Sequence, residues 1–309
     1  MVGICHLFDK YPVNEKVIFP LFDFQNDFWF FYNGYGGVAI FFLISGYIIP
    51  ASMKNCKNFF TFILKRIIRI YPLFIVVYLY SLWRFENFNY NQLIALILPI
   101  ADFFNIPFLF DPDWTLRIEF LFYIIIGLIF YFNKLTFRSL YICIFINILF
   151  ILYSYYNFLF EWNFKLRFMI FLFLGSLLNL LEQQNFSNNK NSLMTILLFI
   201  LVILIFEIFG FNYKYFHENV TIGTIIFIIF YLIHQTKYRI KSNKFIQILG
   251  DITYSLYLLH YLIYKDLYNL FDSHFLAIIG LFFICFLVYN LIEKPLLKFL
   301  HKKFIVKII

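Results

Sequence analysis

The segment Phe62-Ile-Leu-Lys65-Arg66-Ile-Ile-Arg69-Ile-Tyr71-Pro72-Leu73 decides the fold, because it puts cations at the mouth of an apolar helix. A guanidinium keeps its proton, so placing one near lipid is costly unless a carboxylate or another anion meets it. A spacing of three puts Arg66 and Arg69 on one helical face, where both can contact the same phosphate group. The alternative is a topological anchor, in which the pair only fixes which end of the helix faces the cytoplasm.

The whole chain is more apolar than a soluble domain. Its 309 residues are 63% hydrophobic and 14% charged, and its mean hydropathy is +0.81, whereas soluble domains average about 45–50% apolar and 25% charged residues. These values predict an all-α, polytopic membrane bundle that forms a single domain over residues 1–309 in a lipid bilayer. The four cysteines have no paired spacing, so the sequence predicts neither a disulfide framework nor a metal site, and it carries no nucleic-acid-binding motif.

Apolar runs of about 17–25 residues predict the membrane-spanning helices. Residues 93–110 contain Pro99, Asp102 and Pro107, which favours a re-entrant or partly buried segment over a full crossing. Residues 1–8 resemble the end of a further helix, which brings the prediction to about ten spans. The other predicted spans are 36–53, 64–83, 116–133, 139–157, 166–182, 193–211, 219–235, 252–271 and 275–297.

The placement of the basic residues predicts the orientation. The net charge is +8, and most of the 25 basic residues fall on the inner side if the N-terminus and the C-terminus are both cytoplasmic. The opposite orientation would reverse this bias, against the positive-inside rule. The predicted inner basic residues are Lys54, Lys57, Lys65, Arg66, Arg69, Lys134, Arg138, Lys190, Lys237, Arg239, Lys241, Lys244, Lys294, Lys298, Lys302, Lys303 and Lys307.

Ionisable residues within apolar runs are functional candidates, because their burial needs a compensating reason. His6 is either a packed, hydrogen-bonded residue or a base that takes a hydroxyl proton near neutral pH. Asp113 or Thr115 is expected to cap a helix, whereas Glu119 lies deeper in the same apolar run and is either paired or catalytic.

Small and polar residues elsewhere have simpler expected roles. Ser45 and Gly46 are expected to let two helices approach closely. Asp251 or Thr253 is expected to cap the helix that carries His260. Tyrosines at spacings of three and four surround this histidine, so they either line a cavity or satisfy the imidazole.

One carboxylate stands close to the end of the chain, at the predicted inner interface. Glu293 precedes a Lys-Pro pair. A salt bridge to an inner basic residue is its simplest role.

Together these segments resemble the acyltransferase-3 family of bacterial integral-membrane O-acyltransferases. The shared order begins with a histidine near the end of the first helix, followed by Gly-Val-x-Ile-Phe-Phe-x-x-Ser-Gly-Tyr and Arg-x-x-Arg-Ile-Tyr-Pro. Trp-Ser/Thr-Leu-x-x-Glu-x-x-Phe/Tyr, Tyr-Ser-Leu-Tyr-Leu-x-His and Ile-Glu-Lys/Arg-Pro complete it. The matching positions in this chain are His6 and residues 38–47, 66–72, 114–123, 254–260 and 292–295.

The resemblance implies transfer of an acyl group, commonly acetyl, to a hydroxyl of an O-antigen, capsule or exopolysaccharide carbohydrate. The donor would be an acyl-CoA, which is a substrate and not a permanently bound cofactor, and the location would be the bacterial inner membrane. The histidine would act by deprotonating the acceptor hydroxyl directly or through a transient acyl-histidine. The residues so implied are His6 and Glu119 for catalysis, Arg66 and Arg69 for the donor, and Trp114, Tyr254 and His260 for substrate binding.

Family members usually carry more residues before this histidine, including an upstream arginine, whereas Met1 stands five residues before His6 here. The first helix is therefore expected to be incomplete, since eight residues cannot cross roughly 30 Å of hydrocarbon. The alternative from another functional class is a transporter, polymerase or flippase for lipid-linked sugars. Many such folds contain an internal repeat, but the two halves of this chain carry different motifs.

Overall fold

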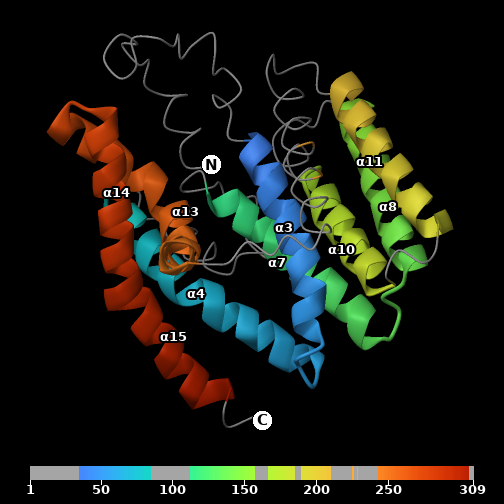
Figure 1. Ribbon diagram of the computed structural model, residues 1–309, viewed down its shortest axis with the longest axis horizontal. Helices are drawn as coiled ribbons and strands as arrows, with labels where there is room; N and C mark the ends of the chain where they lie inside the picture. The colour runs from blue at the N-terminus through green and yellow to red at the C-terminus, as the bar shows by residue number, and fades with distance from the viewer. Residues whose placement is uncertain are drawn as a thin grey trace.

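The computed structural model describes residues 35–84, 112–156, 166–184, 189–209, 225, 228 and 243–305. Within these ranges the elements are all helices, joined by turns, which confirms the all-α prediction for this part of the chain (Figure 1). The expected helix stump at residues 1–8, the re-entrant segment at 93–110 and most of the expected span at 219–235 lie outside the described residues.

The described helices coincide with the spans predicted from the apolar runs. The main difference is that α4 and α13 begin earlier than their predicted spans, because a helix can extend beyond the apolar run that marks its membrane-spanning part. The helices are α3 (Tyr35–Met53), α4 (Phe59–Arg84), α7 (Asp113–Tyr131), α8 (Phe137–Tyr156), α10 (Met169–Gln183), α11 (Asn189–Phe209), α13 (Lys244–Phe271) and α14 (His274–Val288), which continues through the π-helical turn η3 (Tyr289–Glu293), α15 (Lys294–Leu300) and a second π-helical turn, η4 (His301–Ile305).

The cap predicted for α13 is wrong. The helix begins at Lys244, where the Asn243 side chain accepts a hydrogen bond of 2.8 Å from the backbone N–H of Ile246. Asp251 and Thr253 therefore lie inside the helix, and a polar residue in a helix interior does not cap it. The first two turns of α13 are less apolar than the rest of the helix, which is why the sequence pattern indicates a boundary at Asp251.

The cap predicted for α7 is also wrong. Asp113 is the first residue of the helix, but its carboxylate forms a fully buried ion pair with Arg117, one turn later, at 2.8 Å. The Thr115 hydroxyl donates to the carbonyl oxygen of Pro112 at 2.9 Å and so is not available as a cap either. Asp113 pairs with Arg117 instead of capping the helix, because a buried guanidinium without a carboxylate costs more free energy than an uncapped helix end.

Helices α3 and α10 cross in close contact. A Cβ atom added to Gly46 would lie 2.0 Å from the carbonyl oxygen of Leu172, and one added to Gly175 would lie 2.2 Å from that of Leu43. The Ser176 hydroxyl donates across this crossing to the carbonyl oxygen of Gly46 at 3.0 Å. The prediction that Gly46 permits close helix approach is confirmed.

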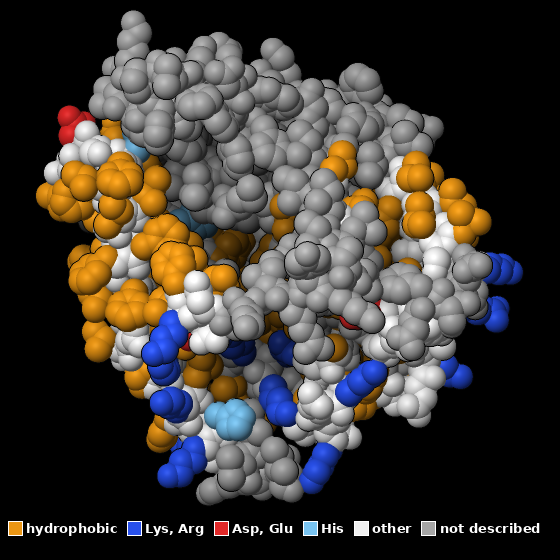
Figure 2. All heavy atoms as spheres, in the orientation of Figure 1, with side chains coloured by type: hydrophobic (Ala, Val, Ile, Leu, Met, Phe, Trp, Pro, Cys, Tyr) orange, Lys and Arg blue, Asp and Glu red, His pale blue; other side chains and the backbone are white. Residues whose placement is uncertain are grey.

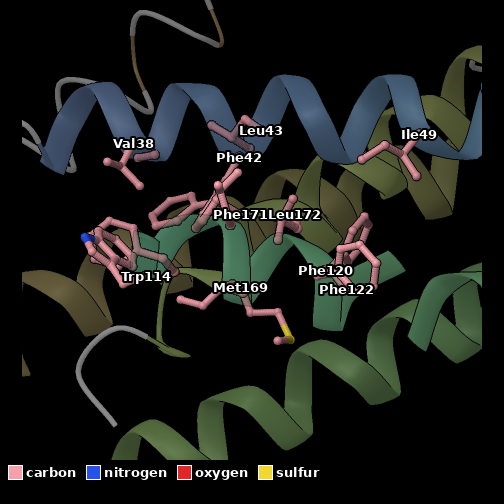
Figure 3. Packing of buried hydrophobic residues seen from close by; sticks show 14 of the residues in the cluster. Val38, Phe42, Leu43, Ile49, Trp114, Phe120, Phe122, Met169, Phe171 and Leu172 are labelled. Atoms are coloured by element: carbon pink, nitrogen blue, oxygen red, sulfur yellow. The ribbon is translucent and has the colours of Figure 1, made fainter. Parts of the chain in front are cut away.

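The core lies around α10. Every residue from 168 to 179 is buried, and side chains from α3, α7 and α10 meet in one cluster (Figure 3). Aromatic rings fill the gap between these helices, with Trp114 of α7 packed against Phe42 of α3 and against Phe168, at centroid distances of 6.3 and 5.5 Å. A helix buried on all sides is typical of the centre of a membrane bundle.

The outer helices expose large apolar side chains. Most of these residues are one-third to three-quarters exposed, which a soluble protein does not tolerate over a continuous surface but a lipid-facing surface does. Among the described residues, Asp113–Tyr131 and the continuous helix His274–Phe304 are long and apolar enough to cross a bilayer, and Gly37–Met53, Phe137–Tyr153, Met169–Gln183 and Lys190–Val202 are shorter apolar helices. The count of about ten crossings stays a prediction. The exposed apolar residues on α8, α11 and α14 include Ile142, Phe145, Ile146, Leu193, Ile196, Leu197, Phe275, Ile279 and Phe283.

Basic side chains gather at one end of the bundle. Figure 2 shows Lys and Arg over the lower part of the face, around a hollow in which further basic side chains lie at depth. In Figure 1 this end carries the turn between α3 and α4 and also α15, and both α15 and η4 pack against α4. This arrangement agrees with the charge bias on which the predicted orientation depends, while the side of the membrane stays a prediction. The exposed basic residues at the α3–α4 turn and on α15 and η4 are Lys54, Lys57, Lys298, Lys302 and Lys303.

Candidate active site

Arg66 is a residue of α4, and its side chain lies against α3 and α7. Its guanidinium donates a hydrogen bond to the Ser52 hydroxyl at the end of α3. The guanidinium carbon also lies 5.4 Å from the ring centroid of Phe62 and 5.6 Å from that of Tyr123 on α7. Its Nε is buried and has no hydrogen-bond partner among the described residues. A buried donor of this kind costs free energy unless a ligand or water accepts its hydrogen bond.

Arg69 turns toward the C-terminal helices. Its Nη1 donates to Glu293 Oε1 at 2.7 Å, and its guanidinium carbon lies 5.8 Å from the ring centroid of Tyr254 on α13. The salt bridge predicted for Glu293 with an inner basic residue is confirmed. The Arg69 side chain is 43% exposed, whereas that of Glu293 is only 1% exposed. Arg69 is therefore accessible to a ligand even though it is paired.

The two arginines thus contact different helices. Arg66 contacts α3 and α7, while Arg69 contacts α13 and η3. Their side chains project from α4 about one turn apart, as a spacing of three residues requires. Their joint contact with one phosphate stays a prediction.

Glu119 lies at a polar centre inside the bundle. It is 6% exposed, and its Oε1 accepts a hydrogen bond of 2.6 Å from the Tyr123 hydroxyl, one turn later on α7. Ser45 and Arg66 also interact with the carboxylate. Because the Tyr123 ring also lies against Arg66, one tyrosine contacts both a predicted catalytic carboxylate and a predicted donor-binding cation.

This centre contains two residues, Ser45 and Tyr123, that are not among the predicted site residues. Gly46 packs at the helix crossing as predicted, and its neighbour Ser45 interacts with Glu119, a contact that the sequence does not predict. Tyr123 is not among the predicted site residues, although its position four residues after Glu119 places both on one helical face and signals the contact.

The residues predicted to bind substrate have separate places in the structure. Trp114 is 3% exposed and packs with aromatic rings of the core. Tyr254 is partly buried beneath Arg69, and its hydroxyl donates to the carbonyl oxygen of Ile70 at 2.7 Å. Of these two, Tyr254 contacts Arg69. A substrate-binding role stays a prediction for both.

His260 is fully buried in α13. Its Nδ1 lies 2.7 Å from the carbonyl oxygen of Tyr257 and 3.2 Å from that of Leu256. A carbonyl oxygen only accepts, so Nδ1 donates, and the second ring nitrogen of a neutral imidazole is then an acceptor. This geometry gives Nδ1 its partners but supplies no hydrogen bond to Nε2 among the described residues, so the two interpretations of the tyrosines around His260 both stay predictions. The Tyr257 hydroxyl forms a hydrogen bond with the Thr115 hydroxyl, which links α13 to α7.

Two further predictions concern the site. His6, the predicted catalytic base, lies outside the described residues. Within the described ranges, no group of three or more His, Cys, Asp or Glu residues could hold a metal ion.

A comparison with models of known protein families gives a match. The family model described as an acyltransferase domain, that of the acyltransferase-3 family, matches residues 1–292, which is nearly the whole chain. Neither the curated proteins nor the solved structures contain a match.

Proposed function

The chain belongs to the acyltransferase-3 family and is therefore a membrane acyltransferase; from this premise we propose that it acylates a hydroxyl group of a carbohydrate. The donor is an acyl-CoA, most simply acetyl-CoA, and the acceptor is a cell-surface or lipid-linked glycan of the O-antigen, capsule or exopolysaccharide type. The proposed location is the bacterial inner membrane, which the chain crosses several times with both termini in the cytoplasm.

The observation that carries the proposal is the cation pair on α4. Arg66 and Arg69 lie one turn apart on α4, and Arg66 contacts Ser52 next to the α3–α4 turn, where exposed lysines lie. Coenzyme A carries several phosphate charges and is made in the cytoplasm, and guanidinium groups suit phosphate oxygens because they bind them in a bidentate fashion. The buried Nε of Arg66 and the 43% exposed side chain of Arg69 supply donors for such an anion.

The proposed chemistry is an attack by the acceptor hydroxyl on the thioester. His6 removes the hydroxyl proton, and the oxygen then forms a bond to the thioester carbonyl carbon while the carbon–sulfur bond breaks. The proton passes from His6 to the departing thiolate, so the imidazole is regenerated. We also propose a catalytic role for Glu119, because this carboxylate is buried and held in place by Tyr123.

The test uses the purified protein in lipid nanodiscs with radiolabelled acetyl-CoA and an isolated surface glycan. Transfer of label to the glycan is expected for the wild type, with loss of transfer for His6→Ala and for Arg69→Ala. Lys298→Ala is the matched control, because it removes one exposed positive charge at the same end of the bundle without touching the pair. Transfer that persists in both His6→Ala and Arg69→Ala would disprove the mechanism.

A further inference from the structure

We propose that Glu293 is a positioning residue for the acyl donor, because it holds the Arg69 guanidinium with one edge turned toward the donor phosphate. This inference rests on the proposed function, since it takes the donor phosphate as the ligand of Arg69. Glu293 itself does not touch the donor and acts through the arginine.

Both oxygens of the Glu293 carboxylate are engaged. Oε1 accepts from Arg69 Nη1 at 2.7 Å, and Oε2 accepts from the Ser255 hydroxyl at 2.6 Å. The carboxylate is 1% exposed, so these bonds form away from bulk water, where charge-assisted hydrogen bonds are strong and well oriented. Ser255 thus fixes the carboxylate, and the carboxylate fixes one edge of the arginine.

A second contact fixes the plane of the guanidinium. The Tyr254 ring lies 5.8 Å from the guanidinium carbon, and its hydroxyl is tied to the carbonyl oxygen of Ile70 on α4. Cation–π contact and the ion pair together restrict the side chain, which otherwise has many rotamers. An arginine restricted in this way loses less conformational entropy when it binds an anion.

The remaining edge of Arg69 is suited to a phosphate. A guanidinium has five N–H donors in a planar fork, so a bond to Glu293 leaves other N–H groups that can donate to a phosphate. The 43% exposure of the Arg69 side chain shows that a ligand can reach it. The carboxylate also lies at the end of a π-helical turn, a local widening of the helix that is frequent at functional sites.

The alternative is that the pair only joins α4 to the C-terminal helices. A structural bond would affect folding but would leave the affinity for donor unchanged in protein that folds. The two interpretations therefore differ in donor binding, and the isosteric variant Glu293→Gln distinguishes them because it keeps the shape of the side chain and removes its charge.

The experiment measures acetyl-CoA binding and steady-state transfer with the full-length protein in nanodiscs. For Glu293→Gln we expect the donor Kd and KM to rise about 10- to 100-fold, as for loss of a hydrogen bond between charged groups, with kcat much less affected. In the Arg69→Ala background, the same substitution should cause no further loss of affinity, because its effect passes through Arg69.

The matched control is Asp266→Asn. It breaks the other partly exposed arginine–carboxylate pair, between Arg84 and Asp266, and should leave the donor KM unchanged. Should Glu293→Gln fail to fold, Ser255→Ala decides the matter, since it removes only the bond to Oε2 and is expected to raise the donor KM in the same direction.

The possible outcomes separate this inference from the proposed function. Wild-type donor affinity in folded Glu293→Gln, or in folded Ser255→Ala if the first variant does not fold, overturns the inference. Failure of the wild-type protein to bind acetyl-CoA overturns the proposed function instead.

Discussion

Replacing Gly46 by alanine tests the close crossing of α3 and α10. The added methyl group would lie 2.0 Å from the carbonyl oxygen of Leu172, whereas ordinary contact begins at 3.4 Å, so α3 and α10 must move apart. Overpacking of this kind costs about 1–3 kcal/mol, while the better helix propensity of alanine returns up to about 1 kcal/mol. We expect a net loss of roughly 1–2 kcal/mol, because the obstacle is backbone and cannot rotate away as a side chain would.

The assay is reversible unfolding of the purified protein in mixed micelles, followed by helical circular dichroism. Gly250→Ala is the matched control, because no atom lies within 4 Å of a Cβ at that position, and it should be neutral or stabilising by up to about 1 kcal/mol. Gly175→Ala should behave like Gly46→Ala, and the double variant should lose less than the sum because both changes separate the same helices. A Gly46→Ala protein as stable as the wild type would refute the reasoning.

Three further predictions concern the polar centre, the buried ion pair and the orientation. Tyr123→Phe should lower kcat/KM for transfer by about 10- to 100-fold without unfolding the protein, because Glu119 loses a charge-assisted hydrogen bond. Asp113→Asn should reduce the free energy of unfolding by about 3–5 kcal/mol, measured in the same micelles, because it leaves the Arg117 charge buried without its carboxylate. A cysteine placed at Lys302, in a variant without the native cysteines, should react with a membrane-impermeant thiol reagent only from the cytoplasmic side.

The ion-pair and orientation predictions each have a control within the chain. Asp266→Asn should cost at most about 1 kcal/mol, because the carboxylate of that pair is half exposed, and an equal loss in both variants would contradict the role given to burial. A cysteine at the exposed residue Asp272, between α13 and α14, should be labelled from the opposite side. Labelling of both cysteines from one side would contradict the predicted orientation, and unchanged kcat/KM in Tyr123→Phe would remove the role of that hydroxyl.

The positions of the described helices could be predicted from the sequence because apolar length alone determines them. The helix ends could not, since capping depends on competing partners: Asp113 pairs with Arg117, and Asn243 caps α13 before its apolar run begins. Neighbouring residues also point in different directions on a helix, so Ser45 and Gly46, one residue apart, contact different partners.

The candidate site was predictable in part. The carboxylate and the arginines were identifiable because ionisable residues in apolar runs are rare, and the Tyr123–Glu119 contact follows from helical spacing. The partner of Arg69 was not identifiable, because Glu293 is 224 residues away and several other basic residues suited that carboxylate equally well. Such a contact depends on how the helices pack, which local sequence does not encode.

The bond between Arg69 and Glu293 has a consequence for biosynthesis. Because 224 residues separate the two, Arg69 is synthesised well before the carboxylate exists. During that interval the Arg69 guanidinium lacks this carboxylate, which is supplied only when the π-helical turn η3 has been made. The order of synthesis therefore delays assembly of the Arg69–Glu293 pair until the segment that carries Glu293 has been made.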